Sequence, residues 1–148
     1  MKPMIIGQAP SRTSDPGEPL SGNSGRRLAD LCGIEFAVFL ETFERKNLVD
    51  SYPGAAAKGD LVVDRVSARE LAGRFRPMVT GRRVVILGLS TAAAFELTHR
   101  AFLFAPHWNG QFAFSPHPSG VNLWWNDAEN EKRARAFFSE LAREARQP

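Results

Sequence analysis

Cysteine is almost absent from this sequence, since Cys32 is the only one in 148 residues. A single thiol excludes an internal disulfide framework, a cysteine-based zinc site and an iron–sulfur cluster. Long apolar runs are missing as well, because no stretch approaches the roughly 18 residues that a membrane-spanning helix needs. We therefore expect a cytoplasmic protein that has neither a membrane span nor a signal peptide.

The composition is that of an ordinary globular protein, and the length predicts one domain over residues 1–148. Hydrophobic residues make up 43% and charged residues 24%, which excludes intrinsic disorder. The net charge is only +3, but most of the 19 basic residues are arginine, the side chain best suited to phosphate recognition. A GC-rich genome would produce the same excess, so the charge permits a nucleic-acid partner without requiring one.

Short apolar runs alternate with helical patterns along the chain. The runs predict strands at 4–6, 47–49, 84–87 and 112–114, and the helical patterns cover 24–31, 34–43, 67–75, 92–98 and 127–146. Strands that are apolar throughout are typical of a sheet covered on both faces. The alternation therefore predicts an α/β fold with a mostly parallel sheet.

Three of the predicted strands lead into loops rich in glycine, proline and polar residues. The loop at 7–25 is long for a segment with almost nothing to bury, and such loops are often functional. The other two follow Val49 and Phe114. In parallel sheets, ligands bind at the carboxyl ends of the strands. We therefore expect the three loops to form one site.

Two of these loops contain recognisable motifs, Gly7-Gln8-Ala9-Pro10 and His117-Pro118-Ser119-Gly120. Together they resemble the two signature loops of the uracil-DNA glycosylase superfamily. The segment 15–26 is similar to the loop after the first motif in its thermostable, iron–sulfur branch, although the cluster cysteines are absent, and the segment 47–49 looks like its second strand. The resemblance covers most of the chain in order. It implies a three-layer α/β/α sandwich with a central four-stranded parallel sheet.

The resemblance assigns catalytic roles to His117, Gln8 and Asp15. His117 would lie at the O2 atom of uracil and stabilise the negative charge on the leaving base. The first motif of the family usually supplies an Asp or Glu to polarise the attacking water, but here Gln8 and Ala9 occupy those positions. Gln8 can orient a water molecule but cannot accept its proton. Asp15 is the nearest acid on the same loop and would contribute electrostatically.

The resemblance also implies a set of base-binding residues. Asn47 would accept a hydrogen bond from N3–H of uracil and donate one to O4, a pattern that cytosine cannot satisfy. The backbone of Gly7, Ala9 and Pro10 would lie beside the sugar. Leu20 departs from the family, which commonly has a phenylalanine stacked on the flipped base. We therefore expect weaker base stacking here.

DNA contacts are expected at the second signature loop and at the start of the first helix. The resemblance implies that Val121 is the aliphatic wedge that would enter the minor groove when the base is flipped. Leu123, Trp124 and Trp125 would extend this wedge or stack on unpaired bases, or else the two tryptophans pin the last helix to the core. Contacts to the DNA backbone are expected from Ser119, Gly120, Asn122, Gly22, Ser24, Gly25 and Arg26.

These observations favour a monomeric hydrolase that excises uracil or a related deaminated base from DNA, with no metal and no cofactor. The turn 88–91 has neither a Walker-type lysine nor a dinucleotide glycine pattern, which argues against a nucleotide cofactor. Because the first motif lacks an acid, a non-catalytic binder of flipped or single-stranded bases is the alternative. A hydrolase of free nucleosides is a third possibility, although a wedge has no use without a DNA strand.

Overall fold

A computed structural model describes residues 1–12, 14–15, 17–57, 61–98 and 100–148. Its five strands are β1 (Met4–Gly7), β2 (Glu44–Asn47), β3 (Arg83–Leu87), β4 (Ala105–His107) and β5 (Gly110–Ser115), in the spatial order β2-β1-β3-β5-β4. The first four strands of that order are parallel, and β4 runs antiparallel to β5. The predicted α/β fold is confirmed, but the prediction of a four-stranded parallel sheet is wrong because the sheet is mixed and has a fifth strand.

The unpredicted strand β4 forms a hairpin with β5. Pro106 lies in β4 and has no N–H group to donate to a neighbouring strand, so the sequence does not indicate a strand here. Proline is nevertheless tolerated in β4 because β4 is an edge strand. Trp108 and Asn109 form the turn, with φ angles of 47° and 63°. Positive φ at both central residues is the property of a tight type I′ hairpin turn.

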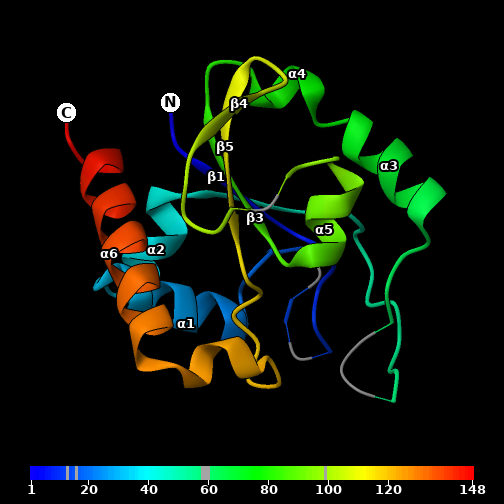
Figure 1. Cartoon of the computed structure of the whole chain (residues 1–148), viewed down its shortest axis with the longest axis horizontal. Coiled ribbons are helices and arrows are strands. Elements are labelled where there is room, and N and C mark those ends of the chain that lie inside the picture. Colours follow the sequence, from blue (N-terminus) through cyan, green and yellow to red (C-terminus); the bar gives the residue numbers. More distant parts are fainter. Residues whose placement is uncertain (13, 16, 58–60, 99) are drawn as a thin grey trace.

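Helices cover both faces of the sheet (Figure 1). One face packs against α1 (Asn23–Cys32), α2 (Phe36–Thr42) and α6 (Ala128–Ala145), and the other against α3 (Arg65–Gly73), α4 (Arg76–Val79) and α5 (Leu89–Ala94). Ile5 of β1 faces the first group, whereas Met4 and Ile6 face the second. Successive strand residues point to opposite faces, so a strand covered on both sides is apolar throughout. In the described ranges, no helix has the length and apolarity to cross a membrane.

Several element boundaries differ from the predictions. Strand β2 ends at Asn47, whereas the predicted strand begins there. The sequence did not indicate the strand before Asn47 because its residues Glu44 to Lys46 are charged and only half-buried at the edge of the sheet. Its pairing with β1 continues past Asn47, where the amides of Leu48 and Val49 donate to the carbonyls of Gly7 and Gln8, each at 2.9 Å. The segment 47–49 is therefore attached to the end of β1, as a site at this edge requires.

Two helices also begin earlier than predicted. Asp64 caps α3 by accepting hydrogen bonds from the amides of Val66 and Ser67, so Ser67 lies inside the helix. These hydrogen bonds lower the pKa of Asp64, with that from Ser67 contributing most. Helix α5 begins at Leu89, directly after Gly88. Gly88 has a φ of 85°, a conformation that suits glycine at a sharp strand-to-helix turn.

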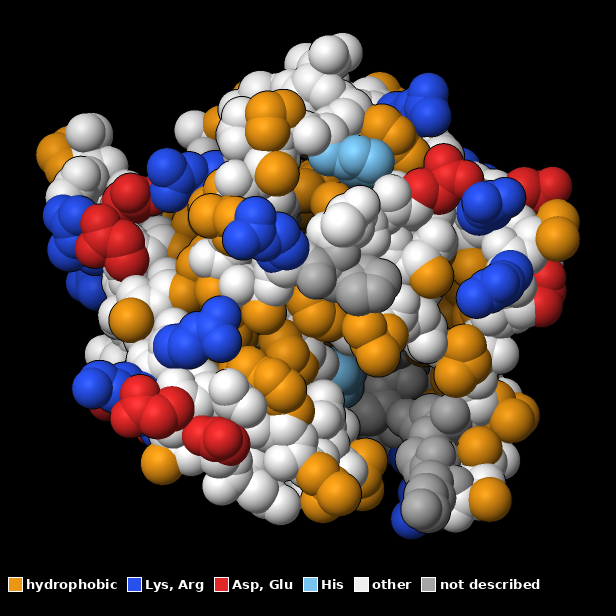
Figure 2. Space-filling model, viewed as in Figure 1, with side chains coloured by type: hydrophobic (Ala, Val, Ile, Leu, Met, Phe, Trp, Pro, Cys, Tyr) orange, Lys and Arg blue, Asp and Glu red, His pale blue; other side chains and the backbone are white. Residues whose placement is uncertain are grey.

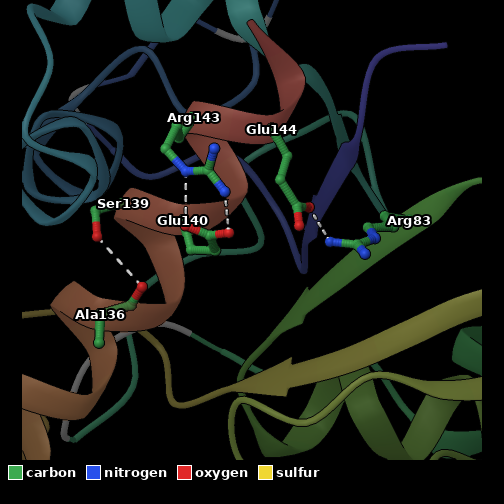
Figure 3. Close-up of polar contacts among 6 residues, drawn as sticks. All are labelled: Arg83, Ala136, Ser139, Glu140, Arg143 and Glu144. Atoms are coloured by element: carbon green, nitrogen blue, oxygen red, sulfur yellow. Dashed lines mark hydrogen bonds and ion pairs between the residues drawn. The ribbon is translucent and has the colours of Figure 1, made fainter. Parts of the chain in front are cut away.

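The last helix, α6, is attached to the sheet by apolar packing and by an ion pair with β3, which Figure 3 shows together with polar contacts inside the helix. Phe138 and Leu141 of α6 are buried in the core on that face. Glu144 pairs with Arg83 at the start of β3, and Nε of Arg143 donates to Glu140 at 2.8 Å. Exposed ion pairs contribute little to stability, so the buried face holds the helix in place.

Cys32, at the end of α1, is predicted to be unreactive in the folded protein. Its side chain is 4% exposed, and burial raises the pKa of the thiol to about 12. At pH 8 a thiol reagent should label it only after denaturation. Because the unfolded thiol ionises near pH 8.5, this residue should also make the protein less stable as the pH rises from there towards 12. Rapid stoichiometric labelling of folded protein would contradict this prediction.

Candidate functional site

The loops that follow β1, β2 and β5 meet at the carboxyl edge of the sheet, towards the lower part of Figure 1. They enclose an inner pocket of about 50 Å³, together with the start of α1. Among its lining residues are Gly7, Ala9, Pro10, Leu20, Gly22, Ser24, Asn47 and His117. Residues predicted from separate motifs are therefore brought together in one place.

A second, more open hollow adjoins the inner pocket. This outer hollow has a volume of about 190 Å³ and shares Ala9 and His117 with the inner pocket. Gln8, Ser119 and Val121 line it as well, together with Pro53 and Leu61, which the sequence did not single out. His117 thus lies at the junction of the two spaces.

Asn47 lines the inner pocket and carries a buried hydrogen-bond acceptor. The residue is 8% exposed, and its Oδ1 has no hydrogen-bond partner among the described residues. Gly7 is its register partner on β1, and a Cβ atom at Gly7 would lie 3.0 Å from Oδ1. A buried acceptor left without a donor costs about 1–3 kcal/mol. The pocket is therefore suited to a ligand that brings an N–H group.

His117 is held in place through its backbone carbonyl. That oxygen accepts hydrogen bonds from Nε1 of Trp125 at 2.8 Å and from Nδ2 of Asn122 at 3.3 Å. On the other side, a Cβ atom at Gly88 would lie 3.3 Å from Cβ of His117, so the turn after β3 packs against it. Asn122 was predicted to contact DNA, but its side chain is used inside the loop, where Oδ1 also accepts from the Trp124 amide at 3.1 Å.

The two tryptophans differ in their surroundings. Trp125 is 5% exposed, and the guanidinium of Arg27 lies 4.8 Å from the centre of its ring. Trp124 is half-buried, with its ring 5.6 Å from that of Phe102. Of the two interpretations made from the sequence, these contacts favour the pinning of the last helix over an extension of the wedge.

Gly25 shapes the pocket without lining it. A Cβ atom at Gly25 would lie 1.7 Å from the carbonyl oxygen of Leu20, so glycine is required for this close approach. Leu20 has a φ of 58°, and its buried side chain lies over Gly7 at the pocket wall. Gly25 therefore has a packing role here, and the predicted phosphate contact of its backbone stays a prediction. Arg26 lies with its guanidinium 4.5 Å from the centre of the Phe36 ring.

No Asp or Glu lines either space, as far as the structure describes them, so the acid expected at the first motif has no substitute there. Gln8 borders the outer hollow, where its Nε2 donates to the carbonyl of Leu61 at 3.1 Å. Asp15 lines neither space, and its Oδ1 accepts from the amide of Gly17 at 2.8 Å in a local turn. The structure therefore does not place the Asp15 carboxylate beside His117.

Size does not distinguish this site from other hollows in the protein. Three larger ones, of about 570, 460 and 740 Å³, lie elsewhere on the surface, and of the predicted site residues only Asn47 lines one of them. Within the described ranges, no group of three or more His, Cys, Asp or Glu side chains is arranged to hold a metal ion. The chemistry of the inner pocket is what distinguishes it.

No protein-family model matches this chain. A search of curated proteins finds no significant match either. We therefore infer the function from the pocket and from the motifs that line it.

Proposed function

We propose that this protein is a monomeric DNA glycosylase-like hydrolase, working without metal or cofactor, that excises uracil or a related deaminated base. The observation that supports this most is that Asn47, whose Oδ1 is buried and has no partner among the described residues, lines a small pocket together with His117. The volume of about 50 Å³ is far below the roughly 300–1,000 Å³ of pockets for drug-sized ligands. A pocket this small suits a single ring rather than a whole nucleotide.

Base selection follows from the hydrogen-bonding groups of Asn47. Its Oδ1 can accept from the N3–H group of uracil, and its amide can donate to O4. Cytosine presents an acceptor at N3. This N3 atom would face Oδ1 of Asn47, and neither of these two acceptors would receive a hydrogen bond. A site with buried polar groups rejects such a mismatch strongly. A related deaminated base would likewise have to present a ring N–H group to Oδ1.

The proposed reaction breaks the bond between C1′ of the sugar and N1 of the base. The electron pair of that bond goes to the base, and a donor from the His117 ring at O2 stabilises the resulting anion. Water adds to C1′ and its proton passes to solvent, because no carboxylate lines the pocket in the part of the chain that the structure describes. Ser119 and Val121 line the outer hollow, where the sugar and the adjacent strand would lie.

The missing carboxylate supports a second candidate function. A protein that binds a flipped base without cleaving it needs Asn47 and the pocket but no general base. Gln8 and Asp15, the two residues that could have compensated, are both engaged in local hydrogen bonds. A non-catalytic binder of deaminated bases is therefore the alternative to an enzyme.

Labelled oligonucleotides with one uracil, single-stranded or opposite guanine, separate these functions. After incubation with the protein and treatment with alkali, strand cleavage at uracil is the expected result. Uracil-selective retention in a gel shift without cleavage would identify a binder. Hydrolysis of free deoxyuridine without salt-dependent DNA affinity would identify a nucleoside hydrolase. The absence of both cleavage and uracil-selective retention would contradict the proposal.

Replacing Trp125 by phenylalanine tests the support of His117. The variant keeps the buried ring but loses the hydrogen bond from Nε1 to the His117 carbonyl. A hydrogen bond of this kind is worth about 0.5–1.5 kcal/mol, so uracil release should slow about 2- to 12-fold. Trp124→Phe is the matched control, because its ring makes aromatic contacts without that bond. Equal rates in the two variants would contradict this role.

A further inference from the structure

Two exposed aliphatic side chains flank the outer hollow. Val121 is 71% exposed and Leu61 is 47% exposed, and they come from loops that are far apart in the chain. Figure 2 shows hydrophobic side chains at the lower edge of the molecule, towards which the parallel strands run in Figure 1. Because both side chains line one hollow, a molecule bound there would cover them together.

The backbone of Leu61 is fixed on both sides. Its amide donates to the carbonyl of Gly54 at 2.8 Å, and its own carbonyl accepts from Nε2 of Gln8 at 3.1 Å. Gly54 has a φ of 105°, and a Cβ atom there would lie 3.2 Å from Cδ1 of Leu61. The exposed side chain is thus presented from a defined backbone position rather than from a loose loop.

We propose that Leu61 is a second insertion residue, which enters the base stack of duplex DNA together with Val121 when a nucleotide is flipped. This inference rests on the proposed function. Turning a base out leaves a gap in the stack, and apolar side chains inserted there offset part of the cost of unstacking. Because Leu61 and Val121 line the same hollow as His117, inserted side chains would lie next to the flipped nucleotide.

The inference also gives Gln8 a role that differs from the one predicted from the sequence. Its Nε2 is occupied by the Leu61 carbonyl, so Gln8 acts on the DNA through Leu61 as a positioning residue. A single-stranded substrate has no duplex stack to fill. The contribution of Leu61 should therefore be specific to double-stranded DNA.

The test compares Leu61→Ala with the wild-type protein on the same uracil placed in a single strand and in a duplex. Loss of the isobutyl group should reduce excision, or retention if the protein is a binder, at least fivefold in the duplex. The single-stranded value should stay within twofold. Leu103→Ala is the matched control, because Leu103 is 51% exposed and lines a different hollow. Leu61→Met, which keeps an apolar chain of similar length, should restore duplex activity.

A fluorescent 2-aminopurine beside the uracil reports flipping in the duplex directly. Wild-type protein should raise its fluorescence, and Leu61→Ala should reduce that rise. Wild-type activity of Leu61→Ala on both substrates would overturn the inference, as would an equal loss of activity on the duplex and on the single strand. If wild-type protein neither cleaves nor retains uracil DNA in either form, the proposed function itself fails, which is a different result.

Discussion

Replacing His117 by alanine is expected to slow the release of uracil from DNA about 100- to 1,000-fold. The imidazole is the only ring donor that lines both the inner pocket and the outer hollow in the described structure. Removing a donor that stabilises charge in the transition state lowers the rate without removing the contacts that bind the substrate. Affinity for uracil DNA should therefore change little while single-turnover excision nearly stops.

His107→Ala is the matched control for this variant. His107 lies in β4, with Nε2 2.8 Å from the carbonyl oxygen of Phe95, and lines neither part of the candidate site. Its replacement should affect folding stability more than excision. A His117→Ala protein that releases uracil at the rate of the wild type would remove His117 from the mechanism.

Replacing Gly25 by alanine is expected to have the largest effect on folding and on the pocket together. The new Cβ atom would lie 1.7 Å from the carbonyl oxygen of Leu20, and backbone at that distance has to move. Overpacking of a buried position costs about 1–3 kcal/mol and occasionally more. Leu20 is part of the pocket wall, so base binding should fall with stability, measured by denaturant unfolding and by gel shift.

Gly73→Ala provides the comparison within the same protein. Gly73 ends α3 and has no atom within 4 Å of a Cβ placed on it, so alanine should be neutral or stabilise by up to about 1 kcal/mol. Wild-type stability in Gly25→Ala would show that the loop before α1 is not held by this contact.

The parts of the fold that were predictable are those in which burial on both faces determines the residue types. The runs around Ile5 and Val85 are apolar because helices cover both sides of β1 and β3. The edge strands were not predicted correctly, because burial does not determine their residue types in the same way. Strand β2 is charged because its edge is only half-buried, and β4 contains a proline that an edge position tolerates.

The position of the site was predictable, because the topology of the sheet determines which loops meet. The orientation of single side chains within the site was not predictable. The rule that loops converge at the carboxyl ends of parallel strands brings Gly7, Asn47 and His117 together, as expected. Whether a side chain points into the pocket is decided by local hydrogen bonds. Asn122 turns inward to the His117 carbonyl, which no motif indicates.

The roles of Gly88 and Leu61 at the site could be predicted from the sequence to different extents. Gly88 follows a strand and precedes a helix, a place where glycine supplies a positive φ, but its contact with His117 requires the three-dimensional arrangement. Leu61 is a leucine in a polar loop, and nothing in the sequence separates it from an ordinary surface residue. Its backbone contacts with Gln8 and Gly54 are what identify it.

The most direct test of the central claim is whether the pocket requires an N–H group opposite Oδ1 of Asn47. Binding is measured for two single-stranded oligonucleotides, one with uracil and one with 3-methyluracil, both with a 2′-fluoro sugar that resists cleavage. The methyl group removes the donor, so affinity should fall roughly 10- to 100-fold, whether the protein is an enzyme or a binder. Equal affinity for the two bases would contradict the assignment of this pocket to base recognition.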